Sequence, residues 1–497
     1  MRFKLISRVG TLVAFVIVCS SLAAGQPCEP EWSTAVGTPG ISQGYIGALQ
    51  VFDDGGGEML YAGGSFPSIA GRAGTPLIAR WDRAGQSWSS VGGGLNRGST
   101  NGFITSIVPF DAGGGPELVV GGFFREAFGI PDTKSIAKWN GSSWSSLGAG
   151  FDPNSAQSVW AMTTWDDGGG EQLYVGGKFP IAGGVTAGGI ASWDGTQWHS
   201  MGSGITGSFN PSVSSMMGFD DGSGSKLYVG GRFDSIDGLS TPLIARWDGT
   251  NWQRVGNGLI SDNALFGIEA MAVYDDGNGP ALYVGGNNFH APGQPVGNVA
   301  KWDGLQWTTI GERYTGRVTR LRTFDDGNGP ALYLGGNALP DPKYFARLVG
   351  GQWQPVGGGV GNNPAPPWPS VFSLGVWDDA LYVGGNFNVA GQLPTAGIAA
   401  WQGCPAFESG DLNCDGVIDA LDIEAFIVAL FDPLNYPVLY PDCDINLADI
   451  NGDGRVDAGD IEGFILLLFG PETVTVKVRE TRPPMTNRER ERSVAGE

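Results

Sequence analysis

The sequence predicts an all-β fold, a ring of seven four-stranded sheets, with a small α-helical module after it. One motif recurs along the chain: an Asp-Asp-Gly turn, a Leu-Tyr-Val-Gly-Gly run, an Ile-Ala-Arg-Trp-Asp-Gly segment and a second Trp. Its glycine pairs begin 49 to 58 residues apart, at Gly63, Gly121, Gly176, Gly230, Gly285, Gly335 and Gly384. Each copy contains four short β-type runs separated by Gly and Asp turns. Because one such sheet cannot bury both of its faces, the copies must stack. These features predict a seven-bladed β-propeller.

The two ends of the repeat region complement each other. The fourth run carries a Trp in six copies, at Trp88, Trp144, Trp198, Trp252, Trp307 and Trp353. The seventh copy stops soon after Trp401, and the missing run stands at the other end, at residues 32–37. An N-terminal strand that joins the last three strands would complete the final blade and remove the open edges. An open solenoid would have no use for an isolated fourth strand. We therefore expect residues 26–404 to form a ring closed by this strand.

The blades resemble kelch repeats, in which a glycine pair follows the second strand and aromatic residues mark the third and fourth. The resemblance covers residues 32–404. It implies that the glycines permit close packing at a strand end and that the tryptophans fill the space between blades. Stacking of these tryptophans on sugar rings is the alternative.

The turns and loops of the repeat should lie on opposite faces. The Asp-Asp-Gly and Trp-Asp-Gly turns both belong to one acidic face, and we interpret the paired aspartates as turn chemistry. Calcium binding there is the alternative. The loops between blades vary from copy to copy and belong to the other face, where we expect recognition. They include residues 95–103, 151–159, 205–213 and 360–371.

Two twelve-residue segments after residue 404 have the spacing of EF-hand calcium loops. Each offers oxygen donors at positions one, three, five, nine and twelve, a carbonyl at seven, and Gly at six for the sharp bend. The first set of candidate ligands is Asp411, Asn413, Asp415, the Val417 carbonyl, Asp419 and Asp422. The second set is Asp449, Asn451, Asp453, the Arg455 carbonyl, Asp457 and Asp460. Since Ca²⁺ takes six or more oxygens, the matched loops predict two calcium sites.

An apolar helix should follow each loop, at residues 423–431 and 461–469. A loop followed by a helix, twice, with Asp at position twelve, resembles the dockerin module, here over residues 405–470. The resemblance implies a cohesin-like partner, chosen partly through loop positions ten and eleven. Those positions hold Ala420, Leu421, Ala458 and Gly459. Another surface protein and the chain's own propeller are the alternative partners.

Four cysteines remain once an N-terminal signal is removed. An even number in an exported chain suggests two disulfides, for which three pairings exist. Cys28 and Cys404 flank the two runs that should meet in the last blade. Cys414 lies inside the first calcium loop and Cys443 lies just before the second. We expect the pairs Cys28–Cys404 and Cys414–Cys443.

The ends of the chain and its charge indicate a secreted protein. Residues 1–25 have the basic start, apolar run and small residues of a signal peptide. This run is too short for a comfortable membrane span, and no other segment is apolar enough. The formal net charge of -21 disfavours nucleic acids and anionic membranes. Residues 471–497 lack a core pattern, and we expect a flexible tail.

No catalytic constellation is evident. The two histidines, His199 and His290, lie in different repeats, and no Ser-His or Cys-His arrangement appears. Two hypotheses follow. The first is a non-catalytic extracellular adhesion or scaffold protein that binds proteins or glycans. The second is a carbohydrate-active enzyme with a dockerin-like appendage, which would need a blade-specific carboxylate pair on the loop-rich face.

Overall fold

The computed structural model describes two compact units. One is Glu29–Cys404, and the other combines Met1–Cys28 with Pro405–Glu497. The described residues are 30–96, 102–152, 157–261, 263, 265, 267–311, 316–337, 344–362, 369–403, 409–414, 417–440, 443, 445–452 and 454–469. The expected signal peptide, the expected tail, and both Cys28 and Cys404 lie outside these residues.

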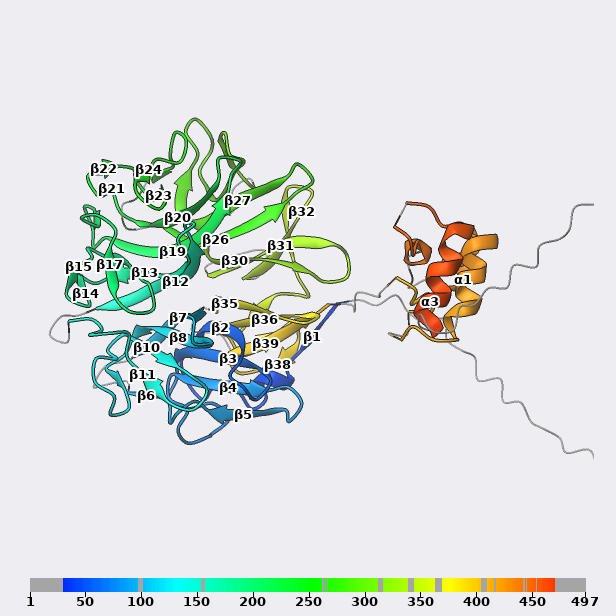
Figure 1. Ribbon diagram of the computed structural model, residues 1–497, viewed down its shortest axis with the longest axis horizontal. Coiled ribbons are helices and arrows are strands. Elements are labelled where there is room, and N and C mark those ends of the chain that lie inside the picture. Colours follow the sequence, from blue (N-terminus) through cyan, green and yellow to red (C-terminus); the bar gives the residue numbers. More distant parts are fainter. Residues whose placement is uncertain are drawn as a thin grey trace, which may run out of the picture. The chain divides into compact units, whose positions relative to one another are not determined.

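Antiparallel groups of four strands, one group for each sequence repeat, build the unit Glu29–Cys404, and we call each group a sheet (Figure 1). A pairing of Asn337 with Ser370 joins the sixth and seventh groups into one eight-stranded sheet. The first three sheets are β2 (Tyr45–Asp53), β3 (Glu58–Ser65), β4 (Ile78–Asp82) and β5 (Ser87–Ser90); β7 (Phe103–Asp111), β8 (Pro116–Phe123), β10 (Ile136–Trp139) and β11 (Trp144–Ser145); and β12 (Ser158–Asp166), β13 (Glu171–Lys178), β16 (Ile190–Trp193) and β17 (Trp198–Ser200). The next three are β19 (Ser212–Asp220), β20 (Ser225–Arg232), β23 (Ile244–Trp247) and β24 (Trp252–Gln253); β26 (Ile268–Asp275), β27 (Pro280–His290), β28 (Gly297–Trp302) and β29 (Trp307–Thr309); and β30 (Arg317–Asp325), β31 (Pro330–Asn337), β32 (Phe345–Val349) and β33 (Gln352–Pro355). The last sheet is β35 (Ser370–Trp377), β36 (Ala380–Asn386), β39 (Ile398–Gln402) and β1 (Glu31–Ser33).

Short ladders order parts of the loops that the sequence left irregular. They pair β6 (Leu95–Asn96) with β9 (Glu126–Ala127), β14 (Ile181–Ala182) with β15 (Val185–Thr186), and β25 (Ile260–Ser261) with β27. Two further ladders have three strands each: β18 (Ile205–Thr206), β21 (Ser235–Ile236) and β22 (Leu239–Ser240), and β34 (Val360–Gly361), β37 (Val389–Ala390) and β38 (Leu393–Pro394). In most of these ladders, a segment that leaves one sheet pairs with the segment after the glycine pair of the next.

The last sheet uses both ends of its unit. β1 pairs antiparallel with β39, with Trp32 opposite Trp401, so the predicted addition of the N-terminal strand is confirmed. Trp32 Nε1 donates a hydrogen bond to the carbonyl of Gly357, just after β33, at 2.9 Å. Trp88 Nε1 of the first sheet donates at 2.9 Å to the carbonyl of Val36, in the short 3₁₀ helix η1 (Ala35–Gly37). The N-terminal segment therefore links the last sheet to both of its neighbours.

Buried side chains fill the space between successive sheets. One cluster joins the first sheet to the last, because it contains Leu60 and Trp88 together with Trp377 and Tyr382. The first strands contact one another in the order β2, β7, β12, β19, β26, β30 and β35, and β35 contacts β2. The first strands thus surround a common centre (Figure 1). Burial of the apolar side chains between them supplies the main driving force for this packing.

A β-bulge interrupts each first strand at the same place, opposite the glycine pair of the second strand. In β19 the extra residue is Ser214, which lies across from Gly230 and Gly231. A Cβ on Gly231 would lie 2.1 Å from the Ser212 carbonyl oxygen, and one on Gly230 would lie 2.7 Å from Ile268 of the next sheet. The repeated glycines are therefore needed for close approach, and they mark a bulge that can redirect a side chain.

The described part of the other unit is helical. It contains α1 (Asp422–Phe431), α2 (Tyr436–Leu439), η2 (Ile445–Ala448), η3 (Ala458–Asp460) and α3 (Ile461–Phe469). The two expected helices are confirmed as α1 and α3, and their Phe426 and Phe464 rings stack with centroids 4.1 Å apart. The sequence did not predict α2 or η2, which are each a single turn. No helix in the described ranges is long and apolar enough to span a membrane.

Candidate functional site

The first aspartate of each paired turn shapes the turn itself. Asp220 Oδ1 accepts backbone N–H groups from Gly222 and Gly224, both at 2.9 Å. The turn between the third and fourth strands of the next sheet packs directly on this one, since a Cβ on Gly304 would lie 2.5 Å from the carbonyl oxygen of Asp221. Both kinds of turn therefore share one face, as the sequence predicted.

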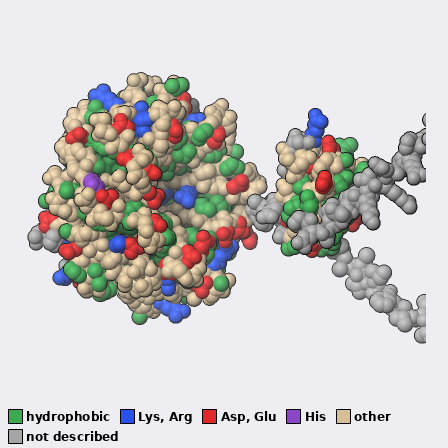
Figure 2. Space-filling model, in the orientation of Figure 1, with side chains coloured by type: hydrophobic (Ala, Val, Ile, Leu, Met, Phe, Trp, Pro, Cys, Tyr) green, Lys and Arg blue, Asp and Glu red, His purple; other side chains and the backbone are tan. Residues whose placement is uncertain are grey.

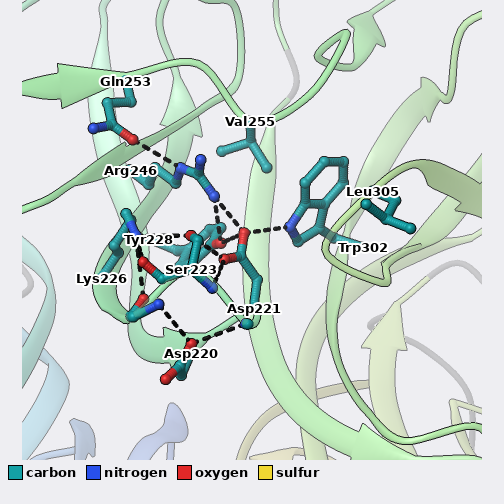
Figure 3. A network of polar contacts seen from close by, with 12 residues as sticks. Asp220, Asp221, Ser223, Lys226, Tyr228, Arg246, Gln253, Val255, Trp302 and Leu305 are labelled. Atoms are coloured by element: carbon teal, nitrogen blue, oxygen red, sulfur yellow. Dashed lines mark hydrogen bonds and ion pairs between the residues drawn. The ribbon is translucent and has the colours of Figure 1, made fainter.

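The second aspartate ties two sheets together (Figure 3). Asp221 Oδ2 accepts a hydrogen bond from the Tyr228 hydroxyl at 2.7 Å and pairs with Arg246, both from its own sheet. It also accepts a bond from Trp302 Nε1 of the next sheet at 3.1 Å. The side chain of Asp221 is only 1% exposed, so this carboxylate is committed to protein partners.

This network explains why Asp, Tyr, Arg and Trp recur together. Asp326 repeats it with Tyr333 at 2.7 Å, Arg347 at 2.8 Å and Trp401 at 3.3 Å. The second repeat lacks both the Asp and the Tyr of this network, although the Trp of the next sheet is kept as Trp193. Ala112 stands where the other sheets have the second Asp. Val119 stands at the Tyr position in β8. The repeated carboxylates therefore serve the sheets, as the turn interpretation predicts.

The pKa of Asp221 reflects this environment. Burial favours the neutral carboxyl and opposes ionisation. Hydrogen bonds from Ser223, Tyr228 and Trp302, together with the charge of Arg246, outweigh burial and lower the pKa of Asp221 to about 2. The carboxylate is therefore ionised at any physiological pH, and its charge strengthens the bonds it accepts.

A cavity of about 460 Å³ lies where the bulged ends of the first strands converge. The extra residue of every bulge lines it: Gly47, Thr105, Trp160, Ser214, Glu269, Thr319 and Phe372. These seven residues are of six types, with Thr in two sheets, although their neighbours repeat. Figure 2 shows a hollow near the middle of one face of the larger unit, with a basic side chain inside it. At the bulge positions the residue type can vary between sheets and can therefore suit a particular ligand. We call this cavity the bulge pocket.

One side of the bulge pocket is charged. Arg317 Nε donates to both carboxylate oxygens of Glu269, at 2.6 and 2.8 Å. Arg320 lies beside this pair and donates to the carbonyls of Gly47 at 3.2 Å and Thr105 at 3.4 Å. These carbonyls belong to β2 and β7, so the guanidinium reaches from β30 across to other first strands. Burial lowers the pKa of Arg320, whereas the charge of Glu269 acts in the opposite direction.

Aromatic rings line another part of the bulge pocket. Tyr45 and Phe372 pack with ring centroids 5.0 Å apart. Trp160 packs against Phe103 at 5.3 Å and remains 38% exposed. The pocket therefore combines apolar ring faces with guanidinium and hydroxyl groups, which suits a small ligand with both apolar and polar surfaces.

The described lining does not have the groups of a hydrolase. Glu269 is its one carboxylate, and Arg317 already pairs with it, whereas glycoside hydrolysis requires two. His199 contacts Asp194 at 2.7 Å on β17, and neither it nor His290 lines the bulge pocket. The sequence interpretation assigned recognition to the loops and missed this strand position. The sequence does carry a signal for this position, because one residue of each repeat varies while the residues on either side of it recur.

The two calcium-type loops are closed in the same way. Asp422, at position twelve, is buried, and its Oδ1 accepts N–H groups from Leu412 at 2.7 Å and Asn413 at 2.9 Å. Its Oδ2 accepts the N–H of Asp419 at 2.8 Å. Asp460 repeats these three contacts at the same loop positions. Both carboxyl groups are buried, and the hydrogen bonds that they accept within the described residues come from backbone N–H groups of their own loops.

The remaining predicted ligands stand in these loops, before α1 and α3. They are Asp411, Asn413, Val417 and Asp419 in the first loop, and Asp449, Asn451, Arg455 and Asp457 in the second. Asp415 and Asp453 lie outside the described residues. Across the ranges that are described, no three His, Cys, Asp or Glu side chains converge as a metal site would require. A disulfide joins Cys414 to Cys443, with Cα atoms 5.7 Å apart.

Comparison with known proteins identifies the C-terminal module. The family model of the Dockerin type I domain matches residues 409–465. Dockerin domains bind calcium and typically bind cohesin partners, and they are typical of extracellular proteins. A search of curated proteins found no match.

Solved structures similar to this chain include β-propellers. The WD40 β-propeller domain of Doa1 is 13% identical with a TM-score of 0.37, and the alignment covers 73% of this chain and 93% of that one. For Saccharomyces cerevisiae Sqt1 the identity is 11%, the TM-score 0.38, and the coverage 76% and 99%. For the GH74 enzyme of Niastella koreensis the values are 14%, 0.36, 74% and 53%, so this chain spans about half of that enzyme.

Proposed function

We propose that this chain is a secreted, non-catalytic binding protein with two recognition elements. The first is a closed seven-bladed, kelch-like propeller that takes its ligand in the bulge pocket. The second is a dockerin-like module that docks on a surface partner in the presence of calcium. The observation that carries this proposal is the lining of the bulge pocket: each sheet contributes its bulge residue, and these seven residues are of six types on a scaffold whose other positions repeat.

The ring closure is supported from both ends of the repeat region. β1 completes the last sheet, and Trp32 and Trp88 make matching hydrogen bonds on either side of it. The cluster between the first and last sheets resembles those between other neighbours. A closed ring holds the bulge residues rigidly around one centre, which favours specific binding by lowering the entropy lost on association.

The docking role is supported by the surface of the helical module. Large apolar side chains are exposed just before, on and after α1, including Leu421, Ile427, Phe431 at 79% and Leu434 at 89%. Several large exposed apolar side chains within fourteen residues support a protein interface here. Leu421 is position eleven of the first loop, where the dockerin resemblance expects partner choice. A cohesin-like protein is therefore the partner we propose.

Two calcium sites are part of the proposal, and calorimetric titration of the full chain with Ca²⁺ tests them. We expect two ions per chain. Asp411→Ala and Asp449→Ala, at position one of each loop, should each reduce this number to one, because Ca²⁺ relies on charged oxygen ligands. Asp432→Ala, between the loops, is the matched control and should leave two. Unchanged stoichiometry in both loop variants would contradict the two-site assignment.

The non-catalytic role is tested with a polysaccharide panel in calcium and in chelator. We expect retention of at least one polysaccharide without release of reducing ends, because the described pocket lining offers only one carboxylate. If the purified protein still releases reducing ends from a polysaccharide, this result would instead establish the enzyme hypothesis.

A further inference from the structure

We infer that the bulge pocket binds an acidic saccharide, with Arg320 and Arg317 holding the carboxylate of a uronic acid unit. This inference deepens the proposed function and rests on it. Arg320 directly follows the bulge of β30. At the same position every other first strand has Ala or Ser: Ala48, Ser106, Ala161, Ser215, Ala270 and Ser373. A long charged side chain at a place where the repeat keeps small residues indicates a role particular to this sheet.

The charges of the bulge pocket do not balance. Its described lining includes Arg232, Arg317 and Arg320 against Glu269. Glu269 is paired with Arg317, while Arg232 and Arg320 bond to backbone carbonyls and to no described carboxylate. The side chain of Arg317 is 42% exposed, but burial lowers the pKa of Arg320, and a guanidinium removed from water is costly unless a negative charge compensates it. In a chain with a net charge of -21, this excess of positive charge indicates an anionic ligand.

The geometry leaves guanidinium N–H groups for that ligand. Arg317 uses only Nε for Glu269, and its two terminal nitrogens have no acceptor among the described residues. Arg320 is already held by carbonyls of β2 and β7, so little side-chain entropy is lost when an anion binds. Carboxylates are favoured because they match the planar guanidinium fork.

The rest of the lining selects a sugar. Trp160 and the Tyr45–Phe372 pair offer flat apolar surfaces that fit the C–H face of a pyranose ring. Ser212 and Ser214 add hydroxyl groups that can bond to sugar hydroxyls. A cavity of about 460 Å³ also lies within the range of small-ligand sites. An acidic peptide would use the arginines but has less need of the aromatic surfaces.

Calorimetry with the full chain and three probes tests the inference: trigalacturonate, the neutral cellotriose, and triglutamate as the acidic peptide. We expect trigalacturonate to bind most tightly, and more weakly at high salt. Arg320→Ala should weaken it at least about 10-fold, because a charge-assisted bond is lost. This variant introduces the residue that other first strands have at the position, so the fold should be kept. Arg322→Ala is the matched control, since it removes the same charge from the same strand but does not line the bulge pocket.

Four results would overturn the inference. Equal affinity for cellotriose and trigalacturonate would remove the role of the carboxylate but leave a glycan-binding protein. Tighter binding of triglutamate would replace the saccharide with an acidic peptide. Equal losses in Arg320→Ala and Arg322→Ala, or no binding of any probe, would also refute it. The polysaccharide panel and the calcium titration judge the proposed function separately.

Discussion

Replacing Asp221 by Ala tests whether the buried carboxylate holds two sheets together. The change leaves Arg246 without its carboxylate partner and removes the acceptor of the buried Tyr228 hydroxyl and of Trp302 Nε1. Breaking a buried ion pair costs about 3–5 kcal/mol. Each orphaned donor costs about 1–3 kcal/mol, although these terms overlap within one network. Because Arg246 keeps 18% exposure and can be hydrated, we expect a loss of about 4 kcal/mol.

The neighbouring aspartate provides the matched control. Asp220→Ala changes the same turn but removes only two exposed backbone hydrogen bonds, so we expect a loss of about 1 kcal/mol. The entropy of unfolding is about 2.1 cal/mol/K per residue over the unit Glu29–Cys404. The loss of about 4 kcal/mol in Asp221→Ala therefore corresponds to a fall in Tm of about 5 °C. Calorimetry and urea unfolding of the two variants measure the difference.

A second variant uses the repeat that lacks the network. Asp221→Ala combined with Tyr228→Val reproduces Ala112 and Val119 of the second sheet. Because the hydroxyl no longer needs an acceptor, the double variant should lose less stability than the sum of its single changes. Equal losses for Asp221→Ala and Asp220→Ala, or strict additivity in the double variant, would refute the proposed role of the network.

Two further predictions concern the pH dependence of stability and the last sheet. The pKa of Asp221 in the folded protein, about 2, lies below the ordinary value near 4, so its contribution of about 2 kcal/mol is complete above about pH 4 and is lost as pH falls towards 2. Urea midpoints between pH 5 and 2 should therefore fall more steeply in the parent than in Asp221→Ala, and parallel curves would contradict this. Trp32→Ala should cost about 3–5 kcal/mol, because Trp32 is buried against Trp401 and Phe345, and it should speed amide exchange in β39. Unchanged exchange in β39 would show that β1 does not secure the last sheet.

Much of the larger unit could be predicted from the sequence because its contacts repeat. In six of the sheets the Trp of the fourth strand bonds to a carbonyl that follows the fourth strand of the preceding sheet or lies in η1, as Trp252 does with Met201 at 2.8 Å. Because each of these contacts joins residues that are about the same number of positions apart, the residues that make them recur at regular intervals along the sequence. The N-terminal strand could be predicted for the same reason, since Trp32 supplies the one Trp that the last repeat lacks. In the helical module, the loop spacing and the apolar periodicity were enough to predict α1 and α3.

The bulge pocket could not be predicted in this way, and only the tertiary structure revealed it. Side chains alternate between the two sides of a strand, so one extra residue changes which side chain faces the centre. The variable position can be seen in the sequence, but the local pattern does not show that Glu269 and Phe372 line one cavity. The partners of Arg320 include the carbonyls of Gly47 and Thr105, which come from repeats far away in sequence. The repeat by itself determined the sheets, their turns and the contacts between neighbours. The convergence of one bulge residue from each sheet depends on how the first strands pack against one another, and the tertiary structure alone decided it.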